Sequence, residues 1–545
     1  MKKVITLFAY LCCILLIPVT QTKAQSSVQP GLTPQFMTDI TIEQNTLANQ
    51  RHVRIASAFN GWMFAAFIVN DTVSHKGGVV VSYSRNGGIN WLPFNGYPYF
   101  DHSWYTGCDI TVEGVDTALL NVFVGDVRRD LISNKYEVEV QRYEAIHIAF
   151  PPTQVYFKQL DSNKVYDMAL TSDYRQPSVS PPVDTVYTVG LLYNHHGFGM
   201  DTMIFATTES KSKYKFGKGR VVDTEAHLRN LALSYSYSAT ANKGTYNAAW
   251  ESLDTTTSTF GHILTSRSTM RVDSAWLKPT YLDSLNPSFI NMLRSPSIAC
   301  QNSNTDNDSS NATAAISFDY ARNGFADSLD LYAYVNNRAD STNFWSLLAL
   351  AVTNHNELQS NLAYDAKNNQ FLITYYDSTA GGLVYMTDSV SHLLPVNLVN
   401  TQYNDLTTNL KAPWPRVVSN PSTKGAFFAW AIESSTAEGV IKCDGTYLFT
   451  STGPILQLDG MKVFNPYPNP ATSAVILPVF SDLAAELKIT LVDVLGQPVW
   501  SEMKSVPAGG LMNIDLDVAA YAAGVYFCRI ETATASHTLR LVVQH

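Results

Sequence analysis

Residues 53–84 read VRIASAFNGWMFAAFIVNDTVSHKGGVVVSYS, and this stretch decides the fold. A short strand pattern, Val53–Ala58, precedes a long apolar run, Trp62–Asn70, and an alternating segment, Gly78–Ser84. The Gly, Asn and Asp residues between these segments favour turns. Strand patterns that lie this close in sequence tend to pair, so the stretch predicts three antiparallel strands of one sheet.

The same three-part unit recurs down the chain, and a repeat of this size determines the architecture. Clear copies cover residues 231–266, 297–336, 361–388 and 416–442, and weaker copies cover 110–143 and 185–207. The period is roughly 50 to 65 residues, which suits the blade of a β-propeller, a sheet of four short strands. We predict an all-β fold in which about seven blades occupy residues 25–456. Tandem immunoglobulin-like sandwiches are the alternative, but they need about 100 residues per unit.

The composition agrees with a folded β protein and argues against nucleic acid as a partner. Hydrophobic residues make up 46% of the 545 residues and charged residues 15%, with 29 Tyr and 25 Phe. Aromatic residues favour strands. A formal net charge of -9 repels phosphate backbones, and no stripe of Lys and Arg reverses it locally. Because Cys108, Cys300, Cys443 and Cys528 are widely spaced, we expect mostly buried thiols instead of a disulfide or zinc framework.

The first 24 residues have the pattern of an export signal. Lys2 and Lys3 precede an apolar run, Val4–Ile17, and a small residue on either side of Lys23 marks a cleavage site. We predict cleavage between Ala24 and Gln25. A membrane-spanning helix needs about 20 apolar residues, and no later segment reaches that length, so the mature chain is expected to have no membrane span.

The segment Ser84–Trp91, SRNGGINW, resembles the Asp-box of sialidase-like propellers, S-x-D-x-G-x-x-W, with Asn86 in place of the usual Asp. We expect Gly88 to adopt a positive φ and Trp91 to cover the adjoining blade. In that family the box is a folding element away from the active site. The resemblance therefore supports the architecture and assigns no catalytic residue.

Residues 463–545 resemble the type A sorting domain of the type IX secretion system, after a linker predicted at 457–462, and we expect them to fold as a small β-sandwich. The resemblance rests on Pro466–Pro470, Ile489–Gly496, Ala523–Tyr526 and Leu539–Val543. The motif positions are Pro466, Pro468, Asn469, Pro470, Asp493, Gly496, Gly524, Tyr526 and Arg540. An ordinary C-terminal β-sandwich used for adhesion is the alternative interpretation.

The resemblance to the sorting domain implies a secreted Bacteroidetes protein. Its partner would be the type IX secretion machinery, and its route would lead through the periplasm to the cell surface or the medium. The larger region before residue 457 would be the passenger of this export.

No catalytic motif emerges from the passenger sequence, and we nominate no catalytic residue. A sialidase holds a sugar carboxylate with three arginines, and this chain has arginines near predicted blade starts at Arg51, Arg54, Arg229, Arg294 and Arg416. The Arg-Ile-Pro motif of that family is missing, since Arg54-Ile55 is followed by Ala56. A passenger that binds glycan or protein at one end of its channel is the favoured interpretation, and a glycoside hydrolase of the sialidase-like class is the alternative.

We expect no metal site and no cofactor. The pair His195-His196 has no third ligand and is predicted to lie in a solvated loop. The segment Asp306–Ser309 could offer oxygen ligands to Ca²⁺, but its spacing is not that of an EF-hand, and a polar turn explains it as well.

Overall fold

The structure is a computed structural model that describes residues 35–544 apart from gaps between strands. The longest gaps are 43–48, 95–100, 145–151, 174–187, 269–274, 303–312, 338–344, 390–400, 404–409, 433–438 and 448–455. The predicted export signal, with its cleavage site at Ala24 and Gln25, lies outside the described residues. No helix in the described part of the chain is long and apolar enough to cross a membrane.

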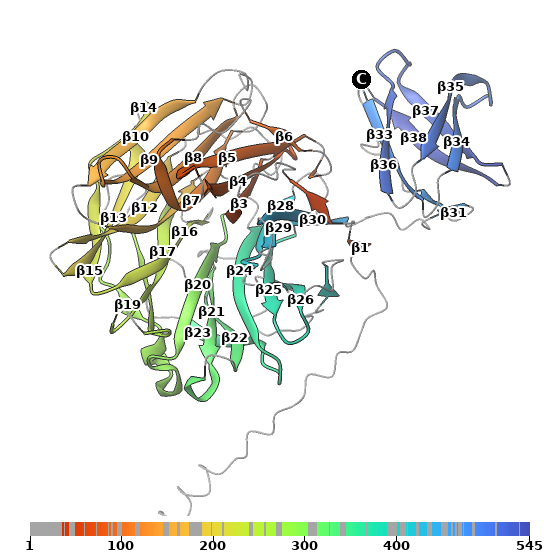
Figure 1. The fold of residues 1–545 in the computed structure, drawn as a ribbon. Helices are drawn as coiled ribbons and strands as arrows, with labels where there is room; N and C mark the ends of the chain where they lie inside the picture. Colours follow the sequence, from red (N-terminus) through yellow and green to blue (C-terminus); the bar gives the residue numbers. More distant parts are fainter. Residues whose placement is uncertain are drawn as a thin grey trace, which may run out of the picture.

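Seven antiparallel sheets surround a common axis in the described residues, so the predicted all-β propeller of about seven blades is confirmed (Figure 1). Blade one has β3 (Asn49–Ser57), β4 (Met63–Asp71), β5 (Lys76–Ser84) and β6 (Leu92–Pro93). Blade two has β7 (Ser103–Glu113), β8 (Asn121–Asp130), β9 (Tyr136–Glu144) and β10 (Thr153–Leu160). Blade three has β11 (Val165–Ser172), β12 (Val189–Gly197), β13 (Met200–Glu209), β14 (Ser212–Phe216) and β15 (Arg220–Glu225).

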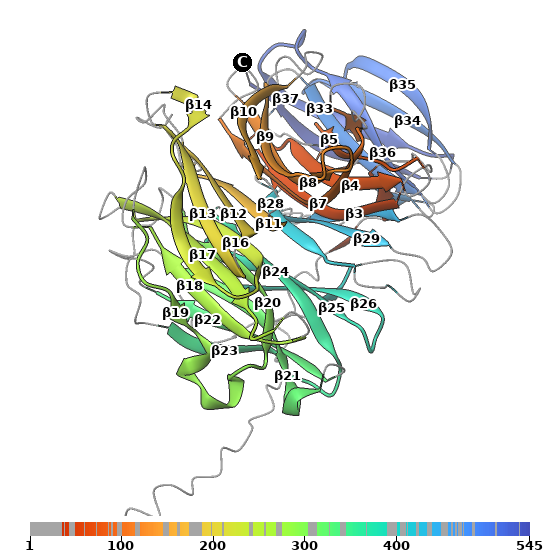
Figure 2. The same ribbon diagram turned by 60° about the vertical axis from the view of Figure 1, so that its left-hand side comes forward.

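The remaining blades follow the same order along the chain, and Figure 2 shows β16, β17 and β18 running side by side. Blade four has β16 (Leu228–Ser238), β17 (Lys243–Ser252), β18 (His262–Arg267) and β19 (Thr280–Tyr281). Blade five has β20 (Leu293–Cys300), β21 (Ala314–Ala321), β22 (Leu329–Asn336) and β23 (Trp345–Ala351). Blade six has β24 (Glu357–Asp365), β25 (Gln370–Asp377), β26 (Gly382–Ser389) and β27 (Thr401–Gln402). Blade seven has β28 (Arg416–Asn420), β29 (Gly425–Ile432) and β30 (Val440–Tyr447), joined by β1 (Gln35–Phe36) and β2 (Ile40–Thr41).

The two ends of the passenger meet in blade seven. Both β1 and β2 pair antiparallel with β30, with Gln35 opposite Tyr447 and Ile40 opposite Cys443. The side chain of Gln50 on β3 also accepts the N–H of Ile441 at 3.1 Å. The ring is therefore closed by strands from opposite ends of the propeller region, which protects sheet edges that would otherwise be exposed.

The long apolar runs in the sequence are the second strands of the blades, and both of their faces are buried. On β4, Met63 and Phe67 pack against Phe427 of blade seven. Phe64, on the opposite face of β4, packs against Val122 of blade two. A strand that is covered on both sides needs no polar alternation, which explains the unbroken run MFAAFIVN.

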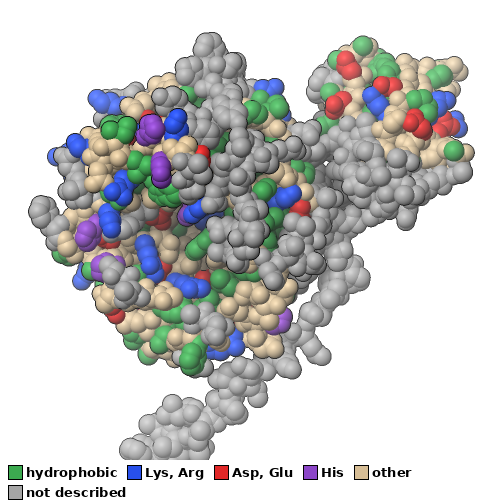
Figure 3. Space-filling view, in the orientation of Figure 1, with side chains coloured by type: hydrophobic (Ala, Val, Ile, Leu, Met, Phe, Trp, Pro, Cys, Tyr) green, Lys and Arg blue, Asp and Glu red, His purple; other side chains and the backbone are tan. Residues whose placement is uncertain are grey.

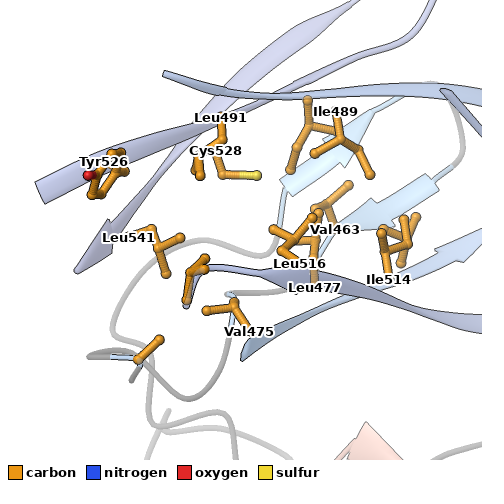
Figure 4. Close-up of a cluster of buried hydrophobic side chains, with 14 of the residues drawn as sticks. Val463, Val475, Leu477, Ile489, Leu491, Ile514, Leu516, Tyr526, Cys528 and Leu541 are labelled. Atoms are coloured by element: carbon orange, nitrogen blue, oxygen red, sulfur yellow. The ribbon is translucent and has the colours of Figure 1, made fainter. Parts of the chain in front are cut away.

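The C-terminal domain is a sandwich of two four-stranded sheets that shares no sheet with the ring. One sheet contains β31 (Leu456–Leu458), β32 (Met461–Val463), β33 (Ala474–Ser481) and β36 (Gly510–Asp517). The other contains β34 (Ala485–Val492), β35 (Pro498–Val506), β37 (Gly524–Glu531) and β38 (Ser536–Val543). Their inner faces share one core that includes Val475, Leu477, Ile489, Leu491 and Leu541 (Figure 4).

The stretch 457–462, expected as a linker, instead contributes residues of β31 and β32 to this sandwich. Leu456 pairs with Val463, and Val463 pairs with Val479 of β33. The side chain of Val463 is buried in the shared core, and this burial stabilises the strand.

All four cysteines of the predicted mature chain are buried free thiols, which confirms the expectation for most of them.

Candidate functional site

The first strand of each blade lines an axial cavity of about 350 Å³. These strands, β3, β7, β11, β16, β20, β24 and β28, contact one another in order, and β28 meets β3 to complete the circle. The cavity walls carry Asn230, Ser297, Asn361 and other polar side chains among aliphatic ones. A cavity of this size and polarity suits a small polar group.

Near their starting ends, the first strands bulge where they face the axis. The pairing register shifts between Arg51 and Arg54 in β3, and similar shifts occur in β7, β11, β16, β20 and β24. Five residues in this layer have a positive φ without being glycine, namely His52 (53°), Asn230 (52°), Ser295 (54°), Gln359 (58°) and Trp414 (45°). Bulges re-aim side chains, and strained backbone of this kind gathers at functional sites.

Buried acidic side chains fasten three of the first strands to the preceding blade, at or next to their bulges. Asp201 accepts the N–H of Leu228 at 2.7 Å, which joins blade three to blade four. Glu251 accepts the N–H of Ser295 at 3.3 Å, which joins blade four to blade five. A further bond of this kind, from Gln359 to Asp319, joins blade five to blade six.

A second layer of hydrogen bonds lies within the cavity wall. Asp109 accepts the N–H of Leu170 at 2.6 Å, and Asp167 accepts the N–H of Leu231 at 2.8 Å. Each of these carboxylates also accepts, on its other oxygen, the N–H of the residue that follows it, at 2.9 Å for Asp109 and 2.8 Å for Asp167. Both carboxylates of the wall are therefore occupied by main-chain donors, and burial raises the pKa of each.

The five arginines picked out from the sequence all lie on first strands, but the structure divides them into two groups. Arg229 pairs with Glu251 at 3.0 Å, and Arg294 pairs with Asp319 at 3.4 Å. These two arginines neutralise the carboxylates that fasten the bulges. Arg51 and Arg54 on β3 and Arg416 on β28 belong to the adjacent blades one and seven. We call these three residues the arginine cluster.

Two members of the arginine cluster have an Nε donor that makes no hydrogen bond to the described residues. Arg54 and Arg416 line the cavity. The Nε of Arg54 lies 3.7 Å from Asp109, whereas the Nε atoms of Arg51 and Arg416 are buried without a hydrogen-bond partner among the described residues. Burial, and then the charge of Arg54, lower the pKa of Arg416 to about 9, so its guanidinium stays charged at neutral pH. Buried donors are almost always paired, so these two Nε–H groups are available to an acceptor from a ligand.

His52 lies between Arg51 and Arg54 on the bulge. Part of its surface is exposed to solvent. Loss of hydration on the side that faces the protein, followed by the charges of Arg54, Arg416 and Arg51, lowers its pKa to about 4. At neutral pH the imidazole is therefore uncharged, and it can donate or accept a hydrogen bond beside the arginines.

The face of the ring seen in Figure 3 shows Lys and Arg side chains and histidines prominently, with few acidic ones, despite the net charge of -9. The cavity wall carries two arginines, Arg54 and Arg416, and two carboxylates, Asp109 and Asp167, whose oxygens already accept main-chain N–H groups. Planar guanidinium groups bind carboxylate and similar anions in a bidentate manner. The arrangement can therefore hold an anionic group.

The segment that resembles an Asp-box lies at the other end of blade one. Ser84 and Ser57 both pair with Met63, so the turn after β5 is remote from the bulge of β3. Gly88 has a φ of 99° and donates its N–H to the Ser84 hydroxyl at 2.9 Å. The Trp91 indole donates to the carbonyl of Gly88 at 2.8 Å, and its ring lies 5.8 Å from that of Phe427 in blade seven. Asn86 lies outside the described residues.

The expected loop at His195-His196 is wrong, because both residues belong to β12. His195 pairs with Thr202 and His196 with Asp201, since the hairpin turns only at Gly199, whose φ is 83°. His196 Nδ1 lies 2.6 Å from the Asp201 carboxylate. The described residues contain no group of three side chains that could hold a metal ion, and Asp306–Ser309 lies outside them.

In the C-terminal domain the predicted motif positions build turns and core. Asp493 accepts the N–H groups of Leu495 and Gln497, both at 2.9 Å, and Gly496 has a φ of 80°, so these residues form the turn between β34 and β35. Tyr526 packs in the core and donates its hydroxyl to the carbonyl of Ala522 at 3.0 Å.

The other motif positions have simpler roles. Gly524 begins β37, Arg540 on β38 pairs with Phe527, and Pro466 is buried. Pro468, Asn469 and Pro470 lie outside the described residues.

Comparison with known families covers this same segment. Residues 465–544 match the family model described as a secretion system C-terminal sorting domain. The C-terminal sandwich is a sorting domain. The sorting domain indicates export through the type IX secretion system to the cell surface or the extracellular space. The passenger that it would carry is the propeller.

For the whole chain, no curated protein matches. Among solved structures, an α-L-arabinofuranosidase from Fusarium graminearum in complex with an iminosugar inhibitor is 8% identical, with 76% of this chain and 98% of that chain covered and a TM-score of 0.39. An α-L-arabinanase from Penicillium chrysogenum complexed with arabinobiose is 9% identical, with coverages of 75% and 98% and a TM-score of 0.39. A protein of unknown function from Dyadobacter fermentans is 9% identical, with coverages of 76% and 99% and a TM-score of 0.40. Likenesses this low say nothing about the activity of the propeller.

Proposed function

We propose that the exported propeller is a binding protein that takes an acidic extracellular glycan, whose anionic group enters the axial cavity and meets the arginine cluster. The observation that carries this proposal is the buried Nε donor of Arg416, which lines a polar cavity and has no partner among the described residues. Arg51 has a second such donor, on the adjoining strand β3. An anion that satisfied these donors would relieve both the unpaired groups and the mutual repulsion of Arg54 and Arg416.

A glycan fits the cavity better than a protein segment does. The cavity of about 350 Å³ is lined by hydroxyl, amide and aliphatic groups, which complement the mixed polar and apolar surface of a sugar. A protein ligand would bring its own main chain into a narrow axial space. An acidic glycan supplies both the anion and the hydroxyl groups.

Hydrolysis of that glycan has less support. A glycosidase needs one carboxylic acid and one carboxylate free to act on the sugar. In the described cavity wall, both oxygens of Asp109 and both oxygens of Asp167 accept main-chain N–H groups. Such carboxylates hold blades together, and the main-chain N–H groups that they accept favour the ionised form over proton transfer to a sugar.

The test is calorimetric titration of the exported chain with oligosaccharides of glucuronate or galacturonate and with their neutral counterparts. We expect the acidic set to bind, and Arg416→Gln to weaken binding by roughly tenfold to a hundredfold, the range for a lost charge-assisted hydrogen bond. Arg129→Gln, which removes the same charge from an exposed position in blade two, is the matched control. Arg51→Gln gives a second measurement if Arg416→Gln does not fold.

Three results would contradict the proposal. Equal binding of acidic and neutral sugars would remove the role of the cluster. Binding of an extracellular protein and of no glycan would change the ligand class. Release of shorter sugars during incubation, followed by chromatography, would favour the hydrolase.

A further inference from the structure

Trp414 has a backbone conformation that a bulky residue rarely adopts. Its φ of 45° lies in the left-handed region, where glycine is the usual residue. Proline residues flank it on both sides, at Pro413 and Pro415. Because proline restricts both its own backbone and that of the residue before it, this segment is rigid before any ligand arrives.

Blade six and the second strand of blade seven hold the strained residue in place. The N–H of Trp414 donates to the side chain of Gln359 in blade six at 3.0 Å. The carbonyl of Pro413 accepts the N–H of Ala431 on β29 at 3.0 Å. Strain persists where the surroundings over-determine a conformation, and it is concentrated at sites that bind or react. A glycine or asparagine would satisfy the same backbone with less strain, so a tryptophan here needs another reason.

The side chain of Trp414 differs from three other indoles of the ring. Trp91 and Trp250 donate hydrogen bonds through Nε1, to Gly88 and Asp223, and Trp430 packs on Tyr403. Trp414 is half-buried, lines the cavity, and has neither a hydrogen bond from its indole nor an aromatic partner among the described residues. It therefore leaves apolar ring surface available at the axis.

The position of Trp414 relative to the arginine cluster is repeated in the neighbouring blade. Trp414 precedes Arg416 by two residues, as His52 precedes Arg54, and both ring residues have a positive φ. Trp414 and Arg416 also line the same cavity. A sugar acid in this cavity can therefore meet an aromatic ring and a guanidinium group together.

We infer that Trp414 is the platform on which the ring of a uronic acid stacks while its carboxylate reaches Arg416. This inference rests on the proposed function and narrows the ligand from acidic glycans in general to those with a carboxylate on the stacked sugar. The face of an indole ring carries negative potential, which attracts the C–H groups on the apolar face of a pyranose. The arginine supplies the charge recognition, and the tryptophan supplies the discrimination between a sugar acid and a simple carboxylate.

The experiment compares Trp414→Gly, Trp414→Asn and Trp414→Phe in the full exported chain, with glucuronate and acetate as ligands. Asn is the residue that blade four has at the corresponding position, Asn230, so this variant keeps a backbone that the fold already tolerates. We expect Trp414→Gly and Trp414→Asn to weaken glucuronate binding at least roughly tenfold, leave acetate binding unchanged, and unfold at or above the midpoint of the parent chain. Trp414→Phe should retain most of the affinity.

Quenching of tryptophan fluorescence by glucuronate should also disappear in Trp414→Asn. Unchanged glucuronate affinity in both Trp414→Gly and Trp414→Asn would overturn the inference. If Arg416→Gln still weakened binding in that case, the proposed function would stand without the platform. If Arg416→Gln had no effect either, both would fall. Equal weakening of glucuronate and acetate by Trp414→Asn would also overturn the platform, because it would show a general loss of the anion site.

Discussion

The carboxylate of Asp319 on β21 accepts the N–H of Gln359 on β24 at 2.9 Å. The bond joins blade five to blade six at a residue whose φ is 58°. Asp319 is fully buried and pairs with Arg294, so a single side chain fastens two blades and neutralises one of the arginines near the axis.

Replacing this side chain should weaken the ring. We expect Asp319→Ala to destabilise the propeller by about 3 kcal/mol, because it leaves the Gln359 N–H and the Arg294 guanidinium without their acceptor. Urea unfolding followed by tryptophan fluorescence measures the change. Asp254→Asn alters an exposed carboxylate in blade four and should shift stability by less than about 0.5 kcal/mol. Similar midpoints for the two variants would argue against the fastening role.

Stability of the ring should also fall as the pH rises through about 7. Burial raises the pKa values of Asp126, Asp319 and Glu357 to about 7, well above the ordinary range of carboxylic acids. The folded protein therefore retains protons that the unfolded chain releases at lower pH, and this contribution to stability is lost as the pH rises through the folded pKa. His52 acts in the opposite sense, since its lowered pKa costs stability as the pH falls from 6.5 towards 4.

The measurement is the unfolding midpoint at pH 5.5 and at pH 8. We expect the higher midpoint at pH 5.5, and Glu357→Gln should reduce the difference, by at most about 1.4 kcal/mol per pH unit for one group. Asp254→Asn serves again as the control. A midpoint that rises between pH 5.5 and pH 8 would show that other groups dominate.

Gly88 should not tolerate a side chain. A Cβ atom at this position would lie 2.1 Å from the Phe427 ring, and the φ of 99° adds strain. Gly199 has a φ of 83° but open space where its Cβ would be, so Gly199→Ala reports the strain alone, about 1 kcal/mol. Gly88→Ala should cost clearly more in thermal unfolding, because the clash falls on the contact between blades one and seven. Equal costs would mean that Phe427 can move aside.

Removal of the sorting domain should stop export without unfolding the passenger. A chain that lacks residues 463–545 is expected to accumulate in the periplasm, because the machinery has no domain to recognise. Fractionation and immunoblotting of cells and medium measure its location. Since the ring and the sorting domain share no sheet, circular dichroism of the shortened chain should retain its β signal. Unchanged surface or medium levels would separate the domain from export.

The architecture was predictable because its cause is local. Each second strand is an apolar run such as Met63–Val69, and its lack of alternation follows from burial on both faces. The turn at Asp493 and Gly496 was similarly visible as a polar turn between two strand patterns. Such features depend on residues close together in sequence.

The candidate site depended on relations that sequence patterns do not express. Nothing in single-residue propensity predicts a left-handed backbone for His52 or Trp414, because the bulges are set by the packing of first strands around an axis. Arg54 and Arg416 meet only because blade seven is adjacent to blade one. One signal was available, since both arginines follow a ring residue by two positions near the start of a blade.

Two expectations were wrong although the sequence contains a signal for each correct structure. The supposed linker contains Asp459-Gly460 between apolar residues, which is a hairpin pattern. The supposed loop at His195-His196 was placed too early, because Gly199 is the residue that permits the turn.

The closure of blade seven by β1 and β2 has a consequence for incompletely synthesised chains. A polypeptide cut short before β30 has no partner for its first strands, and it would keep open sheet edges that invite aggregation. Because the sorting domain follows β30, the same truncated polypeptide also lacks its export address. The order of segments therefore links export to completeness, since a chain that carries the sorting domain also carries every strand of the ring.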